Sequence, residues 1–215
     1  MTILFDMDGT IIDSTEAITE SFAEAFKTLG KEVGEVSKIL PLIGYPLDIM
    51  FVKLGIEKKD TDEFVNAYKA HYRTIVKDKT KLIKGAKEAV EEAYKFARLG
   101  VVTTKTSLYT KEILEYFDML ERFEVIVGRE DVAYTKPHPE PILKALSAMN
   151  ANKQNAWMIG DTILDMSAGR AADIKCAGVL CGYGKEEDLA QYTNVVLKDT
   201  LEAVRYIKSI SKDKE

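Results

Sequence analysis

The sequence predicts an α/β fold: a parallel sheet covered by helices, with a small helical insertion after the first strand. Three observations support this. Short apolar runs recur along the chain, with the length and β-branched content of strands buried on both faces. Segments with helical periodicity separate these runs. The alternation breaks once, after the first run, where about 65 residues show helical patterning alone, far more than a normal connection needs.

The strand-like runs cover residues 3–5, 99–103, 125–127, 157–159, 176–180 and 195–197. Between them, residues 111–117, 141–149 and 201–210 each place apolar side chains on one helical face. Strands that alternate with helices across short loops are typical of a parallel sheet with helices packed on it.

The interruption lies between residues 15 and 80. One helical stripe contains Ile18, Phe22 and Phe26 and ends at Gly30, and a second runs from Phe64 to Tyr72. No strand is expected from the end of the first run to about residue 97. We therefore predict a core domain formed by residues 1–14 and 81–215, and a helical domain formed by residues 15–80.

Composition excludes several classes of protein. The chain has 215 residues, of which 46% are hydrophobic and 30% charged, and its formal net charge is -5. This profile is typical of a soluble globular protein and argues against a nucleic-acid partner, which usually requires a basic excess. No apolar run is long enough for a membrane span, so we expect a cytoplasmic protein with no membrane association. The two cysteines, Cys176 and Cys181, are expected to be reduced thiols.

The strongest chemical signal is Asp6-Met7-Asp8-Gly9-Thr10, directly after the first strand-like run. Ligands of open parallel sheets bind at the carboxyl ends of the strands, and the glycine permits a tight turn there. Alone, the pattern is equally consistent with a surface turn, where Asp and Gly are common.

Other strand ends favour a site. Thr103, Thr104 and Lys105 follow one run, Asp161 and Asp165 follow another, and Lys136 lies in a loop before a helix. Carboxylates gathered at one sheet edge repel each other unless a cation is present. An all-oxygen acidic site suits Mg²⁺ better than zinc, and a carboxylate beside it can act as a nucleophile towards phosphorus.

With these motifs in this order, the sequence resembles the haloacid dehalogenase (HAD) superfamily of phosphatases, which have a Rossmann-like core and, in some members, a helical cap domain. The resemblance covers nearly the whole chain and implies that Asp6 is the nucleophile and Asp8 the general acid and base. It also implies that Thr103 and Lys136 hold the phosphoryl group. Mg²⁺ would be bound by Asp6, the Asp8 backbone carbonyl and Asp161, with Asp165 supporting the metal site.

Within this family the chain is most similar to phosphoglycolate phosphatases, through residues 42–47, 136–141 and 179–184. Asp173 departs from the glycine that many relatives have there, which puts the local geometry in doubt. The expected partner is a small phosphorylated metabolite, and the expected assembly a monomer or weak dimer. Inorganic pyrophosphatase and nucleotidase activities are alternatives, as is a non-catalytic phospho-acceptor module.

Several residues leave two interpretations open. Gly44 and Tyr45 are candidates for substrate contact, or they form a helix–helix turn with no contact; Gly9 and Thr104 are further substrate-binding candidates. Lys105 either contacts substrate or is solvated. For four others we expect ordinary roles: His138 is not a catalytic base, His71 packs in the helical insertion, Arg170 is a helix-surface charge, and Trp157 belongs to the core.

Overall fold

A six-stranded parallel sheet forms the centre of the computed structural model, which describes residues 1–32 and 35–212. The strand order is β5-β4-β1-β6-β7-β8, and every neighbouring pair is parallel. The strands are β1 (Thr2–Phe5), β4 (Arg98–Val102), β5 (Val125–Val127), β6 (Ala156–Gly160), β7 (Lys175–Val179) and β8 (Val196–Leu197).

The order of the strands determines where a ligand can bind. The chain moves from β1 to β4 and β5 on one side, and then returns to place β6, β7 and β8 on the other side of β1. Ligands of open α/β sheets bind beside such a reversal, at the carboxyl ends of the strands. The segments that follow β1, β4 and β6 therefore meet at one crevice.

Helices cover both faces of the sheet. On one face α7 (Glu140–Ala148) packs on β4 and β5, and α8 (Ile163–Ala171) packs on β6 and β7. On the other face α5 (Ala86–Tyr94) packs on β4, and α10 (Thr200–Lys212) packs on β7 and β8. Successive side chains of a strand alternate between the two faces of the sheet. Leu4 therefore packs in the apolar cluster beneath α7 and α8, whereas Ile3 and Phe5 pack in the cluster on the face covered by α5 and α10. The remaining core helices are α6 (Ser107–Tyr116) and α9 (Glu186–Leu189).

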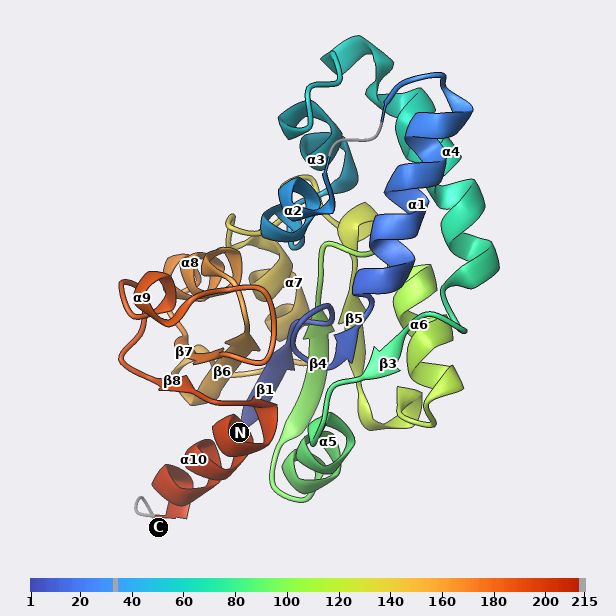
Figure 1. Cartoon of the computed structure of the whole chain (residues 1–215). Helices are drawn as coiled ribbons and strands as arrows, with labels where there is room; N and C mark the ends of the chain where they lie inside the picture. The colour runs from blue at the N-terminus through green and yellow to red at the C-terminus, as the bar shows by residue number, and fades with distance from the viewer. Residues whose placement is uncertain (33–34, 213–215) are drawn as a thin grey trace.

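Within the part of the chain that the structure describes, four α-helices lie between residues 15 and 80. They are α1 (Thr15–Thr28), α2 (Val36–Ile39), α3 (Leu47–Lys53) and α4 (Thr61–Ile75). Figure 1 shows them gathered at the end of the sheet opposite the chain termini. Helix α1 packs along α4, and α3 also packs on α4. We call these helices and the segments that join them the helical insert.

The sequence did not predict the short antiparallel pair at the base of the helical insert. Strands β2 (Ile12–Asp13) and β3 (Lys81–Leu82) pair where the chain leaves and re-enters the core. The expectation of no strand before residue 97 is therefore wrong. Each strand has two residues, one of them charged and exposed, so neither produces an apolar run.

The predicted fold class is confirmed: a parallel, Rossmann-like sheet is covered by helices. All six predicted strands and the three predicted core helices are present, with boundaries that differ by a few residues. The division into domains at residues 14/15 and 80/81 stays a proposal. Among the described helices, none has the length and hydropathy of a membrane span.

Candidate active site

Three carboxylates meet in the crevice at the carboxyl ends of the strands. Asp6 follows β1, Asp161 follows β6, and Asp165 lies in the first turn of α8. One oxygen from each lies within 4.8 Å of the others, and all three residues are buried. Like charges at this spacing destabilise each other unless a cation or a proton compensates them.

Lys136 provides part of this compensation. Its buried ammonium lies 2.8 Å from Asp6 Oδ1 and 2.5 Å from Asp165 Oδ1, and it donates to the Val102 carbonyl at 3.0 Å. Burial lowers the pKa of Lys136, but the charges of Asp165 and Asp6 outweigh that effect and raise it overall. The lysine is therefore a fixed positive charge in the crevice.

One lysine does not neutralise three carboxylates. Burial, and then the charge of Asp165, raise the pKa of Asp6 to about 7, although Lys136 opposes the shift. Burial and the charges of Asp165 and Asp6 raise the pKa of Asp161 well above its ordinary value. In the protein alone the ionised carboxylates thus destabilise each other, which favours binding of a proton or of a further cation.

Local structure fixes each carboxylate. The backbone N–H and hydroxyl of Thr162 both donate to Asp165 Oδ2, at 3.0 and 2.7 Å, which is a capping interaction at the start of α8. Asp161 accepts from the Thr10 hydroxyl at 3.0 Å and from the Tyr183 N–H at 2.8 Å.

Gly9 has a packing reason to be glycine. Its φ is +81°, and a Cβ atom there would lie 2.2 Å from Asp161 Oδ2. The predicted substrate-binding position is thus one where the backbone must approach a carboxylate closely. A role for Gly9 in binding substrate remains a prediction.

Asp8 does not belong to the three-carboxylate group. Its Oδ2 lies 3.1 Å from the ammonium of Lys105, and its Oδ1 accepts a hydrogen bond from the Ser14 hydroxyl. Lys105 also donates to the Tyr72 hydroxyl at 2.8 Å. The Asp8 side chain therefore faces the helical insert rather than the three-carboxylate group, and the predicted metal contact of its backbone carbonyl stays a prediction.

Lys105 is buried, so the interpretation of this residue as a solvated lysine is wrong. Its side chain is 8% exposed and lies against Asp8 and the ring of Tyr72. Burial lowers the pKa of Lys105, whereas the charge of Asp8 and the contact with Tyr72 raise it and prevail. The lysine therefore stays charged and links the loop after β4 to the helical insert.

The two threonines after β4 have different surroundings. Thr103 is buried, its N–H donates to the Val127 carbonyl at 3.0 Å, and its hydroxyl accepts from the Lys105 N–H at 3.2 Å. The Thr104 hydroxyl donates to the Gly44 carbonyl at 3.0 Å. Thr104 and Gly44, both predicted to bind substrate, therefore join the core to the turn before α3.

A cavity of about 390 Å³ lies between the core loops and the helical insert. We call it the insert cavity. Five candidate residues from the sequence line it: Asp8, Gly44, Tyr45, Thr104 and Lys105. Gly44 and Tyr45 thus line a cavity, whereas their contact with substrate stays a prediction, and so does the alternative of a helix–helix turn without such contact.

The remaining sequence predictions concern residues outside the crevice. Trp157 is buried in the core, and Arg170 is exposed on α8, as expected. Exposed His138 accepts a hydrogen bond from the Glu140 N–H and packs on Tyr134. Asp173 stands where many relatives have glycine, and it adopts the left-handed conformation, with φ of 61°.

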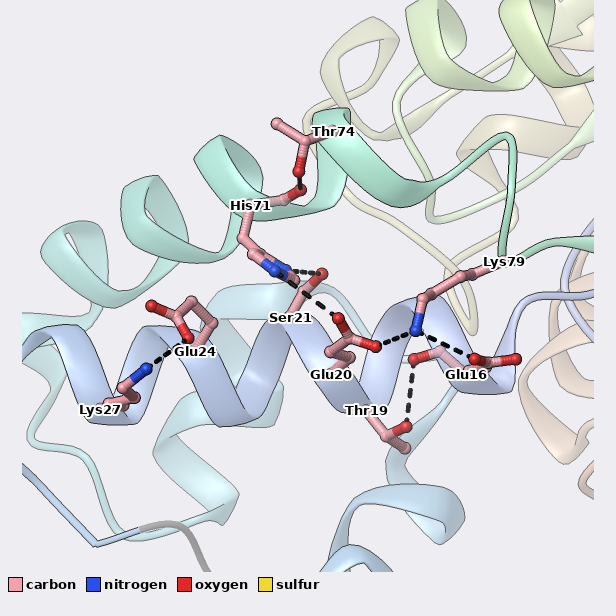
Figure 2. A network of polar contacts seen from close by, with 9 residues as sticks. All are labelled: Glu16, Thr19, Glu20, Ser21, Glu24, Lys27, His71, Thr74 and Lys79. Carbon is pink, nitrogen blue, oxygen red and sulfur yellow. Dashed lines mark hydrogen bonds and ion pairs between the residues drawn. The ribbon is translucent and has the colours of Figure 1, made fainter.

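His71 belongs to a polar network that joins α1 to α4, shown in Figure 2. Its Nδ1 lies 3.2 Å from the Ser21 hydroxyl, and its Nε2 lies 3.8 Å from Glu20. Lys79, on the return to the core, pairs with Glu16 at 3.0 Å and also with Glu20. This network holds the chain that leaves the helical insert against the helix that enters it.

Three residues that support the site were not predicted from the sequence: Ser14, Tyr72 and Tyr183. Tyr183 bonds Asp161 through its N–H, and its hydroxyl lies 3.0 Å from the Thr15 hydroxyl at the start of α1. Ser14 directly precedes that helix, and serine is common at this position, so the sequence pattern could have drawn attention to it. No local pattern distinguishes Tyr72 from the other aromatic residues on the buried face of α4.

Buried carboxylates and a lysine at the central strand ends of a helix-covered parallel sheet are typical of one class of α/β hydrolases. The model of the haloacid dehalogenase-like hydrolase family matches residues 3–179, and the chain belongs to that family. It is a phosphatase of the HAD superfamily.

Individual relatives are similar along most of the chain. "Pyrophosphatase PpaX" of Bacillus cereus is 33% identical over 182 residues, which cover 83% of this chain and 82% of that protein. A haloacid dehalogenase-like hydrolase from Streptococcus pneumoniae superposes with a TM-score of 0.87 at 27% identity, covering 95% of this chain and 97% of that one. A "predicted phosphoglycolate phosphatase" from Haemophilus somnus has a TM-score of 0.87 at 21% identity, covering 95% and 96%, which shows a shared fold alone.

Proposed function

We propose that the protein is a Mg²⁺-dependent phosphomonoester hydrolase that works through an aspartyl-phosphate. The observation that carries the proposal is the crevice in which Asp6, Asp161 and Asp165 share one lysine. A nucleophilic carboxylate, a fixed cation and an excess of buried acid are the parts that phosphoryl transfer requires.

The donor set fits magnesium. Three carboxylate oxygens within 4.8 Å of one another form a hard, all-oxygen site, and Mg²⁺ prefers such ligands. We propose Asp6 and Asp161 as ligands, with the Asp8 backbone carbonyl, and Asp165 as support. When bound, the ion would neutralise charge on the phosphate and so permit a carboxylate to approach it.

In the first step Asp6 attacks the phosphorus through one carboxylate oxygen, and the bond from phosphorus to the leaving-group oxygen breaks. Asp8 donates its proton to that departing oxygen. Lys136 and the Thr103 hydroxyl stabilise the equatorial oxygens of the transferring group. The products of this step are a free alcohol and phosphorylated Asp6.

In the second step Asp8, now a carboxylate, accepts a proton from water while the water oxygen attacks the phosphorus. The bond between phosphorus and Asp6 breaks, which releases inorganic phosphate and regenerates the nucleophile. Asp8 is again protonated, so the cycle closes without another reactant. Its position between the crevice and the insert cavity supports both roles.

The substrate class we propose is a small phosphorylated metabolite. The resemblance favours phosphoglycolate, and the similarity to pyrophosphatase PpaX favours inorganic pyrophosphate as a second candidate. A nucleotide is a third candidate, and a non-catalytic phospho-acceptor is the alternative outside enzymes. Typical turnover numbers of 1 s⁻¹ and above imply an aspartyl-phosphate lifetime of about a second or less in a catalyst.

The test is a hydrolysis screen over about a hundred phosphorylated metabolites and pyrophosphate, each with Mg²⁺ and with EDTA. We expect phosphate release in the Mg²⁺ arm and its loss in EDTA. A stable phospho-enzyme without release, detected by intact mass after acid quenching, would replace the hydrolase with the phospho-acceptor. Release that is indifferent to EDTA would remove the metal from the proposal.

A further inference from the structure

The insert cavity lies on the leaving-group side of Asp8. Asp8 lines it, whereas Asp6, Lys136, Asp161 and Asp165 do not. The phosphoryl group belongs among those four residues, and the proposed function makes Asp8 the acid that protonates the leaving group. Under the proposed function this cavity would hold the leaving group, so its walls determine which leaving groups fit.

The size of the cavity does not match a very small leaving group. Its volume of about 390 Å³ falls in the range, roughly 300–1,000 Å³, that drug-sized ligands fill. Glycolate and orthophosphate, the leaving groups of phosphoglycolate and pyrophosphate, are far smaller than such ligands. Either would leave most of the apolar wall without a contact.

The chemistry of the walls also disfavours an anion. The helical insert contributes Ile18, Leu47, Met50 and Val65, and α6 contributes Tyr109. Placing a charged leaving group against such surfaces costs its hydration without replacing it.

The charged residues around the cavity do not provide a binding site for an anionic leaving group either. Four carboxylates (Asp8, Asp48, Asp62 and Glu130) and three cations (Lys69, Lys105 and Arg129) line it. The most buried of these cations, Lys105, is already paired with Asp8 and Tyr72. The lining thus offers no cationic excess to a second anionic group.

Aromatic rings form one wall. Tyr68 and Tyr72 are stacked, with ring centroids 5.4 Å apart, and Tyr109 meets Tyr72 edge-on at 5.6 Å. All three line the cavity. Such a wall packs well against another ring, through both buried area and aromatic geometry.

We infer that the insert cavity selects phosphomonoesters whose leaving group is an uncharged, ring-sized apolar body. The inference rests on the proposed function and narrows its substrate class. It separates this chain from an enzyme built for phosphoglycolate or pyrophosphate, although the fold and the proposed chemistry are unchanged.

Benzyl phosphate and methyl phosphate test the inference, because their leaving alcohols have similar acidity and differ mainly in size. With Mg²⁺ present, we expect kcat/KM for benzyl phosphate to exceed that for methyl phosphate by at least about tenfold. It should also exceed the values for phosphoglycolate and pyrophosphate. Equal rates for the two esters, or a preference for either anionic substrate, would overturn the inference and leave the hydrolase in place.

Equilibrium binding separates this result from the proposed function. Benzylphosphonate and methylphosphonate cannot be hydrolysed, and calorimetric titration with Mg²⁺ should show the benzyl compound binding at least about tenfold more tightly. If that preference is present but no ester is turned over, the proposed function fails and the selectivity of the cavity stands. Equal affinities overturn the inference whatever the turnover.

Two tyrosines on α6 provide a matched pair of variants. Tyr109 lines the cavity, whereas Tyr116 is 55% exposed and does not. Tyr109→Leu should lower the benzyl-to-methyl ratio at least about threefold, and Tyr116→Leu should leave it unchanged. Should Tyr109→Leu fail to fold, Leu47→Ala, with the exposed Val52→Ala on the same helix as its control, makes the same comparison. A ratio unaffected in both cavity variants would contradict the inference.

Discussion

The crevice and the insert cavity, which Asp8 lines, are built in different ways. The crevice is charged and closely bonded: Lys136 contacts Asp6 and Asp165, and Thr162 donates hydrogen bonds to Asp165. The insert cavity has a wall of aliphatic and aromatic side chains, mostly from helices α1, α3, α4 and α6, and seven charged residues of both signs complete its lining.

This difference separates two tasks. Charge and fixed distances stabilise a transition state whose geometry is the same for every phosphate ester. Shape and apolar surface discriminate among leaving groups, and helices can change these without disturbing the carboxylates. Substitutions in the crevice should therefore affect all substrates alike, whereas those in the helical insert should change the order of preference.

The largest effect is expected from Asp6→Asn. The amide has the shape of the carboxylate but is a poor nucleophile, so kcat should fall at least about 10⁴-fold for every substrate. A generic aryl phosphate assay measures the loss, and circular dichroism checks that the fold is retained. The control is Asp188→Asn, at an exposed position of α9, and it should keep full activity. Retained turnover in Asp6→Asn would remove the aspartyl-phosphate mechanism.

A smaller and selective effect is expected from Asp8→Ala. Loss of a general acid typically costs about 10²- to 10⁴-fold, and the cost falls on leaving groups that need a proton. We therefore expect two different losses in Asp8→Ala. The kcat for an alkyl phosphate should fall at least about tenfold more than the rate of phospho-enzyme formation from an aryl phosphate. Rapid-quench measurement of that step separates it from the later attack by water. An equal loss for both would show that Asp8 does not protonate the leaving group.

The order of the crevice motifs made them predictable from sequence. Asp6, Thr103 and Asp161 each follow an apolar run, and parallel strands bring their carboxyl ends together. Local rules are enough for such a prediction, because each side chain takes its place from its own strand.

The insert cavity could not be predicted in that way. Tyr72 lies on an apolar helical stripe, and periodicity alone assigns it to the core, where it is nearly buried. Its contact with Lys105 joins residues 33 positions apart, and no local pattern encodes it. The β2–β3 pair was missed for a related reason, because two residues are too short to produce alternation.

Gly44→Ala tests whether the turn before α3 couples the two regions. Gly44 has φ of +108°, and a Cβ there would meet Thr162 Cγ2 at 3.3 Å. We expect a loss of about 1–3 kcal/mol of stability and a raised KM, because the turn must move away from Thr162 and Thr104. Gly55→Ala is the matched control: its φ is +93°, and its Cβ would meet nothing within 4 Å.

Thermal unfolding and steady-state kinetics of both glycine variants separate strain from coupling. Gly55→Ala should lower the melting temperature by roughly 2–6 °C through backbone strain and leave KM unchanged. A KM that rises equally in both variants would mean that Gly44 acts through the stability of the helical insert and not through its contact with the core.

The smallest effect is expected far from both regions, at Glu92 on α5. Glu92 pairs with Lys208 at 2.9 Å and Arg205 at 3.2 Å on α10. The hydrogen bond from Lys208, followed by that from Arg205, lowers the pKa of Glu92 despite partial burial. A lowered pKa stabilises the fold above the unfolded value of 4.5, and this contribution is lost as the pH falls through the folded value.

Glu92→Gln should therefore cost about 0.2–1 kcal/mol at pH 7, less at high salt, and almost nothing near pH 3. Urea unfolding at the two pH values measures the change, with exposed Glu88→Gln on the same helix as the control. Because Glu92 contacts neither the crevice nor the insert cavity, kcat and substrate preference should stay as they are. A change in substrate preference would contradict the assignment of preference to the insert cavity. It would show that an ion pair on the surface, outside the cavity, affects which leaving group is accepted.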